Sequence, residues 1–164
     1  MSLLSEVLQE VLNPKFVIQS KNELPYFRNA KQAFEYAKAN KFKYRKTDEA
    51  FELLKDDPLY AYQYVAFFDR FVDGVDILEK TIATSADCSY EYAKQIDHVF
   101  RLGEKTIIEN DPWIAFEYAR DVVRGPWKQA EKTIAKQERA AKAYAKKVLR
   151  ADFKLDGKLI AKYN

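Results

Sequence analysis

The 164-residue chain has few of the residues that most enzyme and metal sites require. It contains one cysteine, Cys88, and one histidine, His98, which excludes an internal disulfide and a zinc site built from cysteine and histidine. No apolar run approaches the roughly 18 residues of a membrane span, and residues 1–15 lack the basic start of a signal peptide. We therefore expect no cofactor, no metal and no membrane partner, and a location in a reducing cytoplasm.

Short catalytic motifs are also absent. The sequence contains no phosphate-binding GxxxxGK(S/T) or GxGxxG run and no HExxH zinc-protease motif. A pair of catalytic carboxylates of the glycosidase type stays open as an alternative, because the distance between the two carboxyl groups in the folded protein decides whether they can act together. Asp73 and Asp76 are such a pair, but they flank Gly74 and are typical of a turn. The sequence predicts a protein that is not an enzyme.

The chain is instead rich in aromatic residues and in internal repeats. Eleven Tyr, eleven Phe and two Trp supply the apolar surface that one domain of this length needs. The motif EKTIA occurs at 79–83 and again at 131–135. Tyrosines within aromatic-Ala motifs recur at separations of 28, 28, 26 and 26, at Tyr36, Tyr64, Tyr92, Tyr118 and Tyr144. Isoleucines recur at separations of 25, 27 and 26, at Ile82, Ile107, Ile134 and Ile160. Two series with one period indicate a repeat architecture.

Residues that favour the start of a helix recur at the same spacing as these tyrosines. Seven residues before each tyrosine stand Asn29, Asp57, Ser85, Asp111 and Gln137, and all but Gln137 are favoured N-caps. Pro58 and Pro112 follow two of them, at the helix position that tolerates proline. We expect Gly74, Gly103 and Gly125 to end the first helix of a unit. Each unit then consists of a helix, a turn and a second helix.

These observations predict an all-α, right-handed-type α-α hairpin solenoid in one domain of residues 1–164. Each hairpin is too short to be stable alone, so stacking must bury its apolar face. Residues 3–12 have an amphipathic helical pattern, and we interpret residues 1–28 as an N-terminal cap. We expect about five repeats of ~26 residues, at about 29–54, 57–83, 85–108, 111–135 and 137–161.

The pattern (Ala/Ser)-(Tyr/Phe)-x-Tyr-Ala-(Lys/Arg), followed by Gly-x-x-x-x-Glu-Lys-x-Ile-Ala, resembles the tandem repeats of tailed-bacteriophage and large-DNA-virus proteins. The likeness covers about residues 30–161 and is clearest at 57–83 and 111–135. It implies a viral origin in a phage, a helical-repeat body and the cytoplasm of a host cell. It implies no catalytic residue.

Charge is divided into blocks along the chain. Residues 21–46 hold eight Lys or Arg against two acids, residues 47–119 six against sixteen, and residues 120–164 thirteen against five. Arg139, Lys142, Lys146 and Arg150 have helical spacing and predict a positive stripe on the last long helix. The candidate binding residues are Lys128, Lys132, Arg139, Lys142, Lys146, Arg150, Lys154 and Lys158, together with Lys41, Lys43, Arg45 and Lys46.

Three interpretations of these basic residues stay open: an acidic partner protein, nucleic-acid phosphates, or a solvated face at the end of the repeats. Self-association through the basic ends and the acidic centre is a further expectation. The function that we expect is non-enzymatic binding to a host protein, with a defence component as one candidate. The alternative is nucleic-acid binding through the N- and C-terminal basic patches.

Overall fold

A computed structural model describes residues 24–163, and this part of the chain is mostly helical with one short two-stranded sheet. The expected helical class is confirmed. The first helices of the units are α2 (Ala30–Asn40), α4 (Pro58–Phe67), α6 (Ala86–Tyr92), α8 (Pro112–Tyr118) and α10 (Glu138–Tyr144). The second helices are α3 (Glu49–Lys55), α5 (Val75–Ile82), α7 (Arg101–Asn110) and α9 (Glu131–Ile134), the last preceded by the 3-10 turn η3 (Lys128–Ala130). The expected cap over residues 3–12 lies outside the described residues.

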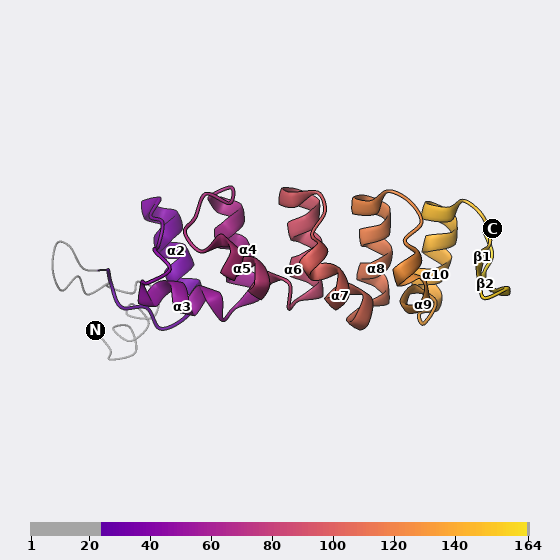
Figure 1. The fold of residues 1–164 in the computed structure, drawn as a ribbon, viewed down its shortest axis with the longest axis horizontal. Coiled ribbons are helices and arrows are strands. Elements are labelled where there is room, and N and C mark those ends of the chain that lie inside the picture. Colours follow the sequence, from indigo (N-terminus) through magenta and orange to yellow (C-terminus); the bar gives the residue numbers. More distant parts are fainter. Residues whose placement is uncertain (1–23, 164) are drawn as a thin grey trace, which may run out of the picture.

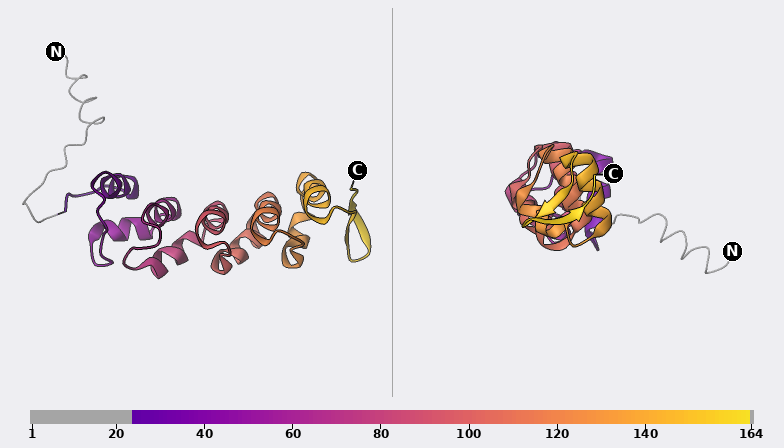
Figure 2. Two further views of the ribbon diagram at one scale, coloured as in Figure 1. Left: turned by 90° about the horizontal axis from the view of Figure 1, so that it is seen from above. Right: turned by 90° about the vertical axis from the view of Figure 1, so that its right-hand side faces the viewer.

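The helices form two rows. Helices α2, α4, α6, α8 and α10 stand side by side in chain order (Figure 1), and α3, α5, α7 and α9 lie along one side of them (Figure 2). Each first helix contacts the next one along the row, from α2 and α4 to α8 and α10. The part of the chain that the structure describes is therefore elongated.

The predicted N-caps are confirmed. The side chains of Asn29, Asp57, Ser85 and Asp111 each accept hydrogen bonds from N–H groups of the first helical turn. Gln137 precedes α10 without a side-chain cap bond, as its residue type predicts. The first helices therefore begin at equivalent positions of their units.

The first helices end without glycine. In the last three units a π-helical turn follows the tyrosine, at η1 (Ala93–Asp97), η2 (Ala119–Val123) and η4 (Ala145–Leu149). The next residue, His98, Arg124 or Arg150, has a positive φ of 52–57°, and Lys41 after α2 has a φ of 50°. Basic side chains at these positions complement the partial negative charge of a helix C-terminus.

The prediction that glycines end the first helices is wrong at two positions. Gly74 is the N-cap of α5 with a φ of 67°, a conformation that glycine adopts without strain. Gly103 lies inside α7, where an added Cβ atom would be 2.3 Å from Ser89 Oγ. Gly103 is thus required for the close packing of α6 and α7. Of the three glycines only Gly125 lies next to the end of a first helix, where it follows Arg124.

The expected second helix of the fifth unit is also wrong. Residues 153–161 form an antiparallel hairpin of β1 (Phe153–Leu155) and β2 (Lys158–Ala161). Asp156 and Gly157 form its turn with φ values of 50° and 78°. Asp-Gly between alternating apolar residues favours a two-residue hairpin turn over a helix. Phe153 and Ala161 are buried under α10, so the hairpin covers the end of the two rows.

Candidate binding surfaces

Tyrosines of the repeat join each unit to the next. The Tyr118 hydroxyl accepts a hydrogen bond from the Phe100 N–H at 3.2 Å and donates to Glu104 at 3.1 Å. The Tyr144 hydroxyl accepts from the Trp127 N–H at 2.9 Å and donates to Glu131 at 3.1 Å. Tyr64 accepts in the same way from Tyr44, and Tyr92 donates to Glu79. All four tyrosines are fully buried, and burial raises the pKa of Tyr64 to about 12.

The Glu of the EKTI motif is the carboxylate that binds the tyrosine, and the Thr and Ile of the motif also have equivalent surroundings in successive units. The hydroxyls of Thr81, Thr106 and Thr133 donate to a backbone carbonyl near the end of the preceding second helix, at Lys55, Ala83 and Ile108 respectively. The distances are 2.6, 2.6 and 2.5 Å. Ile82, Ile107 and Ile134 are fully buried. The Glu and Thr of the motif therefore hydrogen-bond to neighbouring units, and the Ile lies in the core.

The cation of the AFEYAK-type motif covers an aromatic ring four residues earlier. The Lys38 Nζ atom lies 5.8 Å from the Phe34 ring centre, Lys94 lies 5.1 Å from Tyr90, and the Arg120 guanidinium lies 5.2 Å from Phe116. Side chains at i and i+4 meet on one helix face, and such cation-π pairs add stability. The repeated aromatic residues and their cations thus contact one another within the structure.

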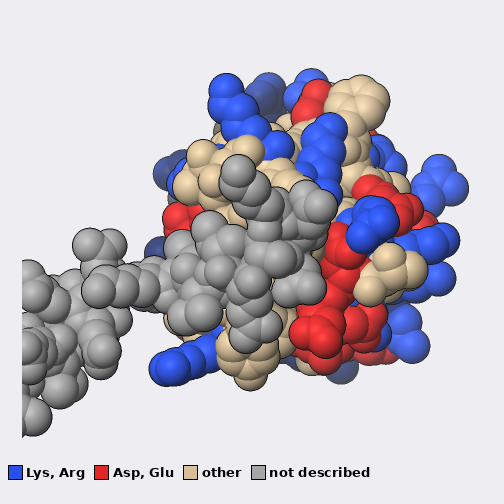
Figure 3. All heavy atoms as spheres, turned by 90° about the vertical axis from the view of Figure 1, so that its left-hand side faces the viewer, with Lys and Arg blue, Asp and Glu red and all other residues tan. Residues whose placement is uncertain are grey.

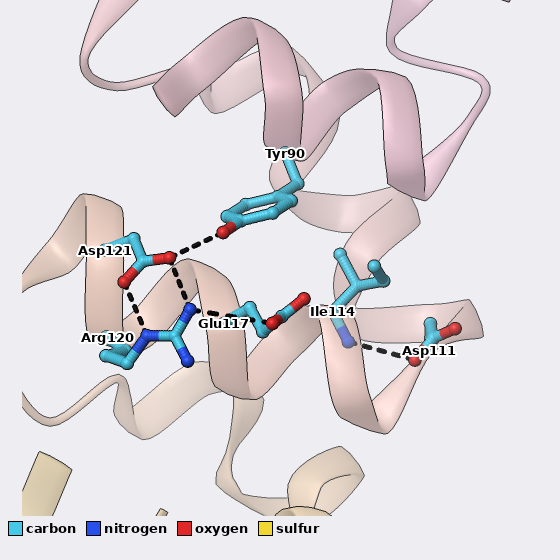
Figure 4. A network of polar contacts seen from close by, with 6 residues as sticks. All are labelled: Tyr90, Asp111, Ile114, Glu117, Arg120 and Asp121. Carbon is cyan, nitrogen blue, oxygen red and sulfur yellow. Dashed lines mark hydrogen bonds and ion pairs between the residues drawn. The ribbon is translucent and has the colours of Figure 1, made fainter. Parts of the chain in front are cut away.

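Figure 4 shows a polar network between α6 and η2. The Tyr90 hydroxyl donates to Asp121 at 2.5 Å, and Arg120 binds both oxygens of that carboxylate at 2.5 and 2.6 Å. Arg120 also lies 3.5 Å from Glu117. The Arg120 and Tyr90 hydrogen bonds lower the pKa of Asp121 to about 2. Each member already has a protein partner, so the network connects two units and leaves no free reactive group.

The N-terminal basic residues lie in the loop between α2 and α3. Lys43 extends over the Phe68 and Phe71 rings, with its Nζ atom 5.5 and 5.9 Å from the ring centres. Arg45 pairs with Asp48 at 3.3 Å. Lys41 and Lys46 are exposed. Seen from the α2 end, basic side chains surround the visible outline and acidic ones gather mainly on one side (Figure 3). This end therefore has mixed charge.

Three of the C-terminal candidates are engaged within the protein. The Arg139 guanidinium lies 4.2 Å from the Trp113 ring centre. Lys142 pairs with Glu138, and Lys128 pairs with Glu131 at 3.1 Å. Arg139 and Lys142 lie in α10, Lys146 lies in the η4 turn with its wider i to i+5 hydrogen bonding, and Arg150 follows that turn with a positive φ. The single stripe expected on one continuous helix is therefore divided.

The other five C-terminal candidates are exposed, and none of them has an ion pair within the described part of the chain: Lys132, Lys146, Arg150, Lys154 and Lys158. The hairpin of β1 and β2 packs against α10, so four of these cations belong to elements at one end of the molecule. We call Lys146, Arg150, Lys154 and Lys158 the basic end. Residues 136–163 hold nine Lys or Arg against three acids, so this part of the chain has a clear excess of positive charge.

The N-terminal and C-terminal basic residues do not form one patch. Helix α2 and the β1–β2 hairpin lie at opposite ends of the elongated arrangement (Figure 1). The structure thus separates Lys41, Lys43, Arg45 and Lys46 from the basic end.

Sequence reasoning missed four exposed apolar residues in or beside two neighbouring loops. Phe67, Phe71, Val99 and Leu102 have exposed fractions of 43, 73, 48 and 55%. We call these four residues the loop patch. The loops touch because Arg70 pairs with Glu79 at 2.9 Å and with Asp97 at 2.6 Å. A shallow depression beside them is lined by Val99, Leu102, Phe100, Arg101, Glu79 and Asp97. Exposure of these four residues depends on how the loops pack, so the sequence gives no direct signal.

Over residues 24–163 no three His, Cys, Asp or Glu side chains gather into a possible metal site. His98 is an exposed helix-end residue and Cys88 is buried. Within the same residues no helix has the length and apolar character that crossing a membrane requires.

Comparison with known proteins gives no relative from which to transfer a function. No protein-family model, no curated protein and no solved structure matches the chain.

Proposed function

We propose that the protein is a helical-hairpin solenoid that acts as a non-enzymatic binding protein, and that its basic end docks on an acidic face of a partner protein. Equivalent contacts at successive junctions support the solenoid: Glu to the next Tyr, and Thr to the preceding carbonyl. Solenoids present extended surfaces that recognise macromolecules. The proposed handedness is the right-handed type usual for such hairpins.

The observation that carries the proposal is the concentration of unpaired cations at the basic end. Some cations elsewhere in the described chain are neutralised, as Arg70 is by Glu79 and Asp97. Lys146, Arg150, Lys154 and Lys158 have no such partner within residues 24–163 and face solvent. A field of one sign attracts a complementary surface and speeds its association.

Exposed apolar side chains beside these cations favour a protein partner over nucleic acid. Leu159 on β2 is 48% exposed and Tyr163 is 47% exposed. Leu159 lies opposite Lys154 in the hairpin register. Protein interfaces combine apolar and aromatic anchors with surrounding charge. The resemblance to phage repeats makes a host protein in the cytoplasm the candidate partner, with a defence component among the possibilities.

Capture from a host lysate tests this proposal. The full chain should retain a stoichiometric protein that the triple variant Lys146→Glu, Arg150→Glu and Lys154→Glu binds at least tenfold more weakly, on the order of 1.4 kcal/mol or more. A control variant with Lys31→Glu, Lys80→Glu and Lys105→Glu has the same net charge and should bind like the wild type. Equal loss in both variants, or no stoichiometric protein at all, would contradict the proposal.

Nucleic-acid binding is the second candidate, because the same four cations also suit phosphates. A gel-shift titration of the full chain with single- and double-stranded DNA and RNA at 50 and 200 mM salt separates the two functions. Affinity that falls by orders of magnitude between these salt concentrations, and that the triple variant abolishes, would favour nucleic acid. Our proposal predicts weak binding without this steep dependence.

A further inference from the structure

The β1–β2 hairpin has two outer edges at the end of the molecule. Its sheet has two strands, so each strand has one edge without a neighbouring strand within residues 24–163. Apart from the ladder between β1 and β2, the backbone-to-backbone hydrogen bonds of the described chain involve no residue of 152–163. An uncovered strand edge is a template on which one more strand can pair.

The geometry of the hairpin indicates which backbone groups point outward. A two-residue turn joins the strands, and Leu155 pairs with Lys158 across it. Residues that flank such a turn bond to one another, and the next pair of an antiparallel ladder turns its N–H and C=O groups away from the partner strand. That next pair is Lys154 and Leu159. The Leu159 N–H and C=O groups therefore face the outer edge of β2.

The outer edge of β2 is accessible. Figure 2 shows the hairpin lying across the end of the two rows, in front of the helices. Leu159 is 48% exposed, and Lys158 is also exposed. After β2 the Tyr163 N–H donates to the Asp152 side chain at 3.0 Å, which keeps the chain aligned beside the start of β1. The edge available for pairing therefore extends from Lys158 to Tyr163.

We infer that the partner contributes an extended acidic segment, which pairs with the outer edge of β2 as a third strand. The inference rests on the proposed docking of the basic end, and it adds the conformation and the charge of the docking element. Strand addition of this kind takes its affinity from main-chain hydrogen bonds and its specificity from the side chains along the edge.

Charge along the edge favours this occupant over a second copy of the chain. Lys158 and Lys162 are exposed, and neither has an ion pair within the described residues. Lysines on an edge strand oppose pairing between identical strands, because like charges meet. A second copy of β2 would bring its own two lysines to the edge, whereas an acidic segment would neutralise both.

A nuclear magnetic resonance titration of the full chain with a defined peptide tests the inference. The probe is the acetylated and amidated peptide Glu-Val-Glu-Val-Glu-Val, which alternates acids with residues that favour strands. It should bind with a dissociation constant on the order of 1 mM, because a short edge offers few ladder bonds. The Leu159 amide should exchange with solvent about tenfold more slowly in the complex. The counterpart peptide with Lys in place of each Glu should not bind.

Variants of β2 separate backbone pairing from side-chain contact. Leu159→Pro removes the outward N–H group at an edge position that tolerates proline, and should weaken peptide binding about tenfold. Leu159→Ala is the matched control, because it removes the side chain and keeps the N–H group, and it should bind within about threefold of the wild type. Lys158→Glu with Lys162→Glu keeps every backbone donor, and should lose the acidic peptide and bind the Lys counterpart instead. The double variant decides the point if Leu159→Pro disturbs the hairpin.

Failure of the acidic peptide to bind at millimolar concentration would overturn the inference and show that the lysines only protect the edge from self-pairing. Equal binding to Leu159→Pro and Leu159→Ala would also overturn it. The proposed function is tested separately in the lysate capture. A host protein that Leu159→Pro retains and the basic-end triple variant loses would keep the docking proposal and exclude strand pairing.

Discussion

At the scale of single residues, each tyrosine of the repeat joins its neighbours by both packing and hydrogen bonding. Its ring fills the interior, and its hydroxyl meets a buried N–H group on one side and a carboxylate on the other, as at Tyr118 and Tyr144. An aromatic residue near the start of the second helix packs on the same ring, as Trp127 does on Tyr118 at 4.7 Å. Loss of one hydroxyl therefore removes a hydrogen bond from each of two polar groups.

Tyr144→Phe should lower the free energy of unfolding by about 1–3 kcal/mol, because the Trp127 N–H loses its acceptor and the buried Glu131 carboxylate keeps only Lys128 as a partner. Urea unfolding followed by circular dichroism measures the loss. Tyr60→Phe is the matched control, since Tyr60 is half-buried and its hydroxyl has no hydrogen bond within residues 24–163. Equal effects of the two substitutions would show that the hydroxyl of Tyr144 contributes nothing.

Asp121→Asn should remove part of the acid sensitivity of the protein. Arg120 and Tyr90 hold the pKa of Asp121 at about 2, below the ordinary value of 3.8. This stabilisation is complete above pH ~4 and is lost as the pH falls towards 2, by an amount on the order of 1–2 kcal/mol. Unfolding free energies between pH 2 and 5 should fall less steeply in the variant. Asp56→Asn, at an exposed aspartate, should keep the wild-type slope.

At the scale of the elements, close packing of α6 and α7 depends on one glycine. The Gly103 backbone lies against Ser89, which is itself fully buried and donates to the Ile82 carbonyl at 3.2 Å. Gly125 lies in the loop after η2, where an added Cβ atom meets nothing within 4 Å. The two glycines therefore differ in what a side chain would cost.

Gly103→Ala should destabilise the protein by roughly 1–3 kcal/mol, because the new methyl group forces α6 and α7 apart. Gly125→Ala should change the stability by less than about 1 kcal/mol, in the stabilising direction through the unfolded chain. Thermal unfolding of both variants decides the point. A Gly103→Ala protein as stable as the wild type would refute the close approach.

Some elements could be predicted from the sequence because their signals are local. Asp57, Ser85 and Asp111 cap helices through bonds to residues two or three positions away. The end of the first helix depends instead on π-helical turns and on a positive φ at residues such as Arg124. The β1–β2 hairpin has a local signal in Asp156-Gly157, but the repeat phase of Ile160 favoured a helix and misled the prediction.

At the scale of the whole molecule, the row of helices separates the two ends. The basic residues of the α2–α3 loop and those of the basic end were predicted as candidates, and their distance apart follows from the linear order of the units. The loop patch could not be predicted, because exposure of Phe71 and Leu102 depends on how neighbouring loops pack. Ion pairs such as Lys128–Glu131 also engage basic residues that the sequence alone suggests as binding candidates.

Deletion of one whole unit tests the proposed solenoid most directly. Removing residues 85–110 joins Thr84 to Asp111, so that Tyr118 takes the place of Tyr92 opposite Glu79. The solenoid predicts a monomer that keeps its helix content per residue and unfolds cooperatively, whereas removal of only residues 85–97 should unfold the chain. An unfolded or aggregated product from the 85–110 deletion, measured by circular dichroism and light scattering, would contradict the account.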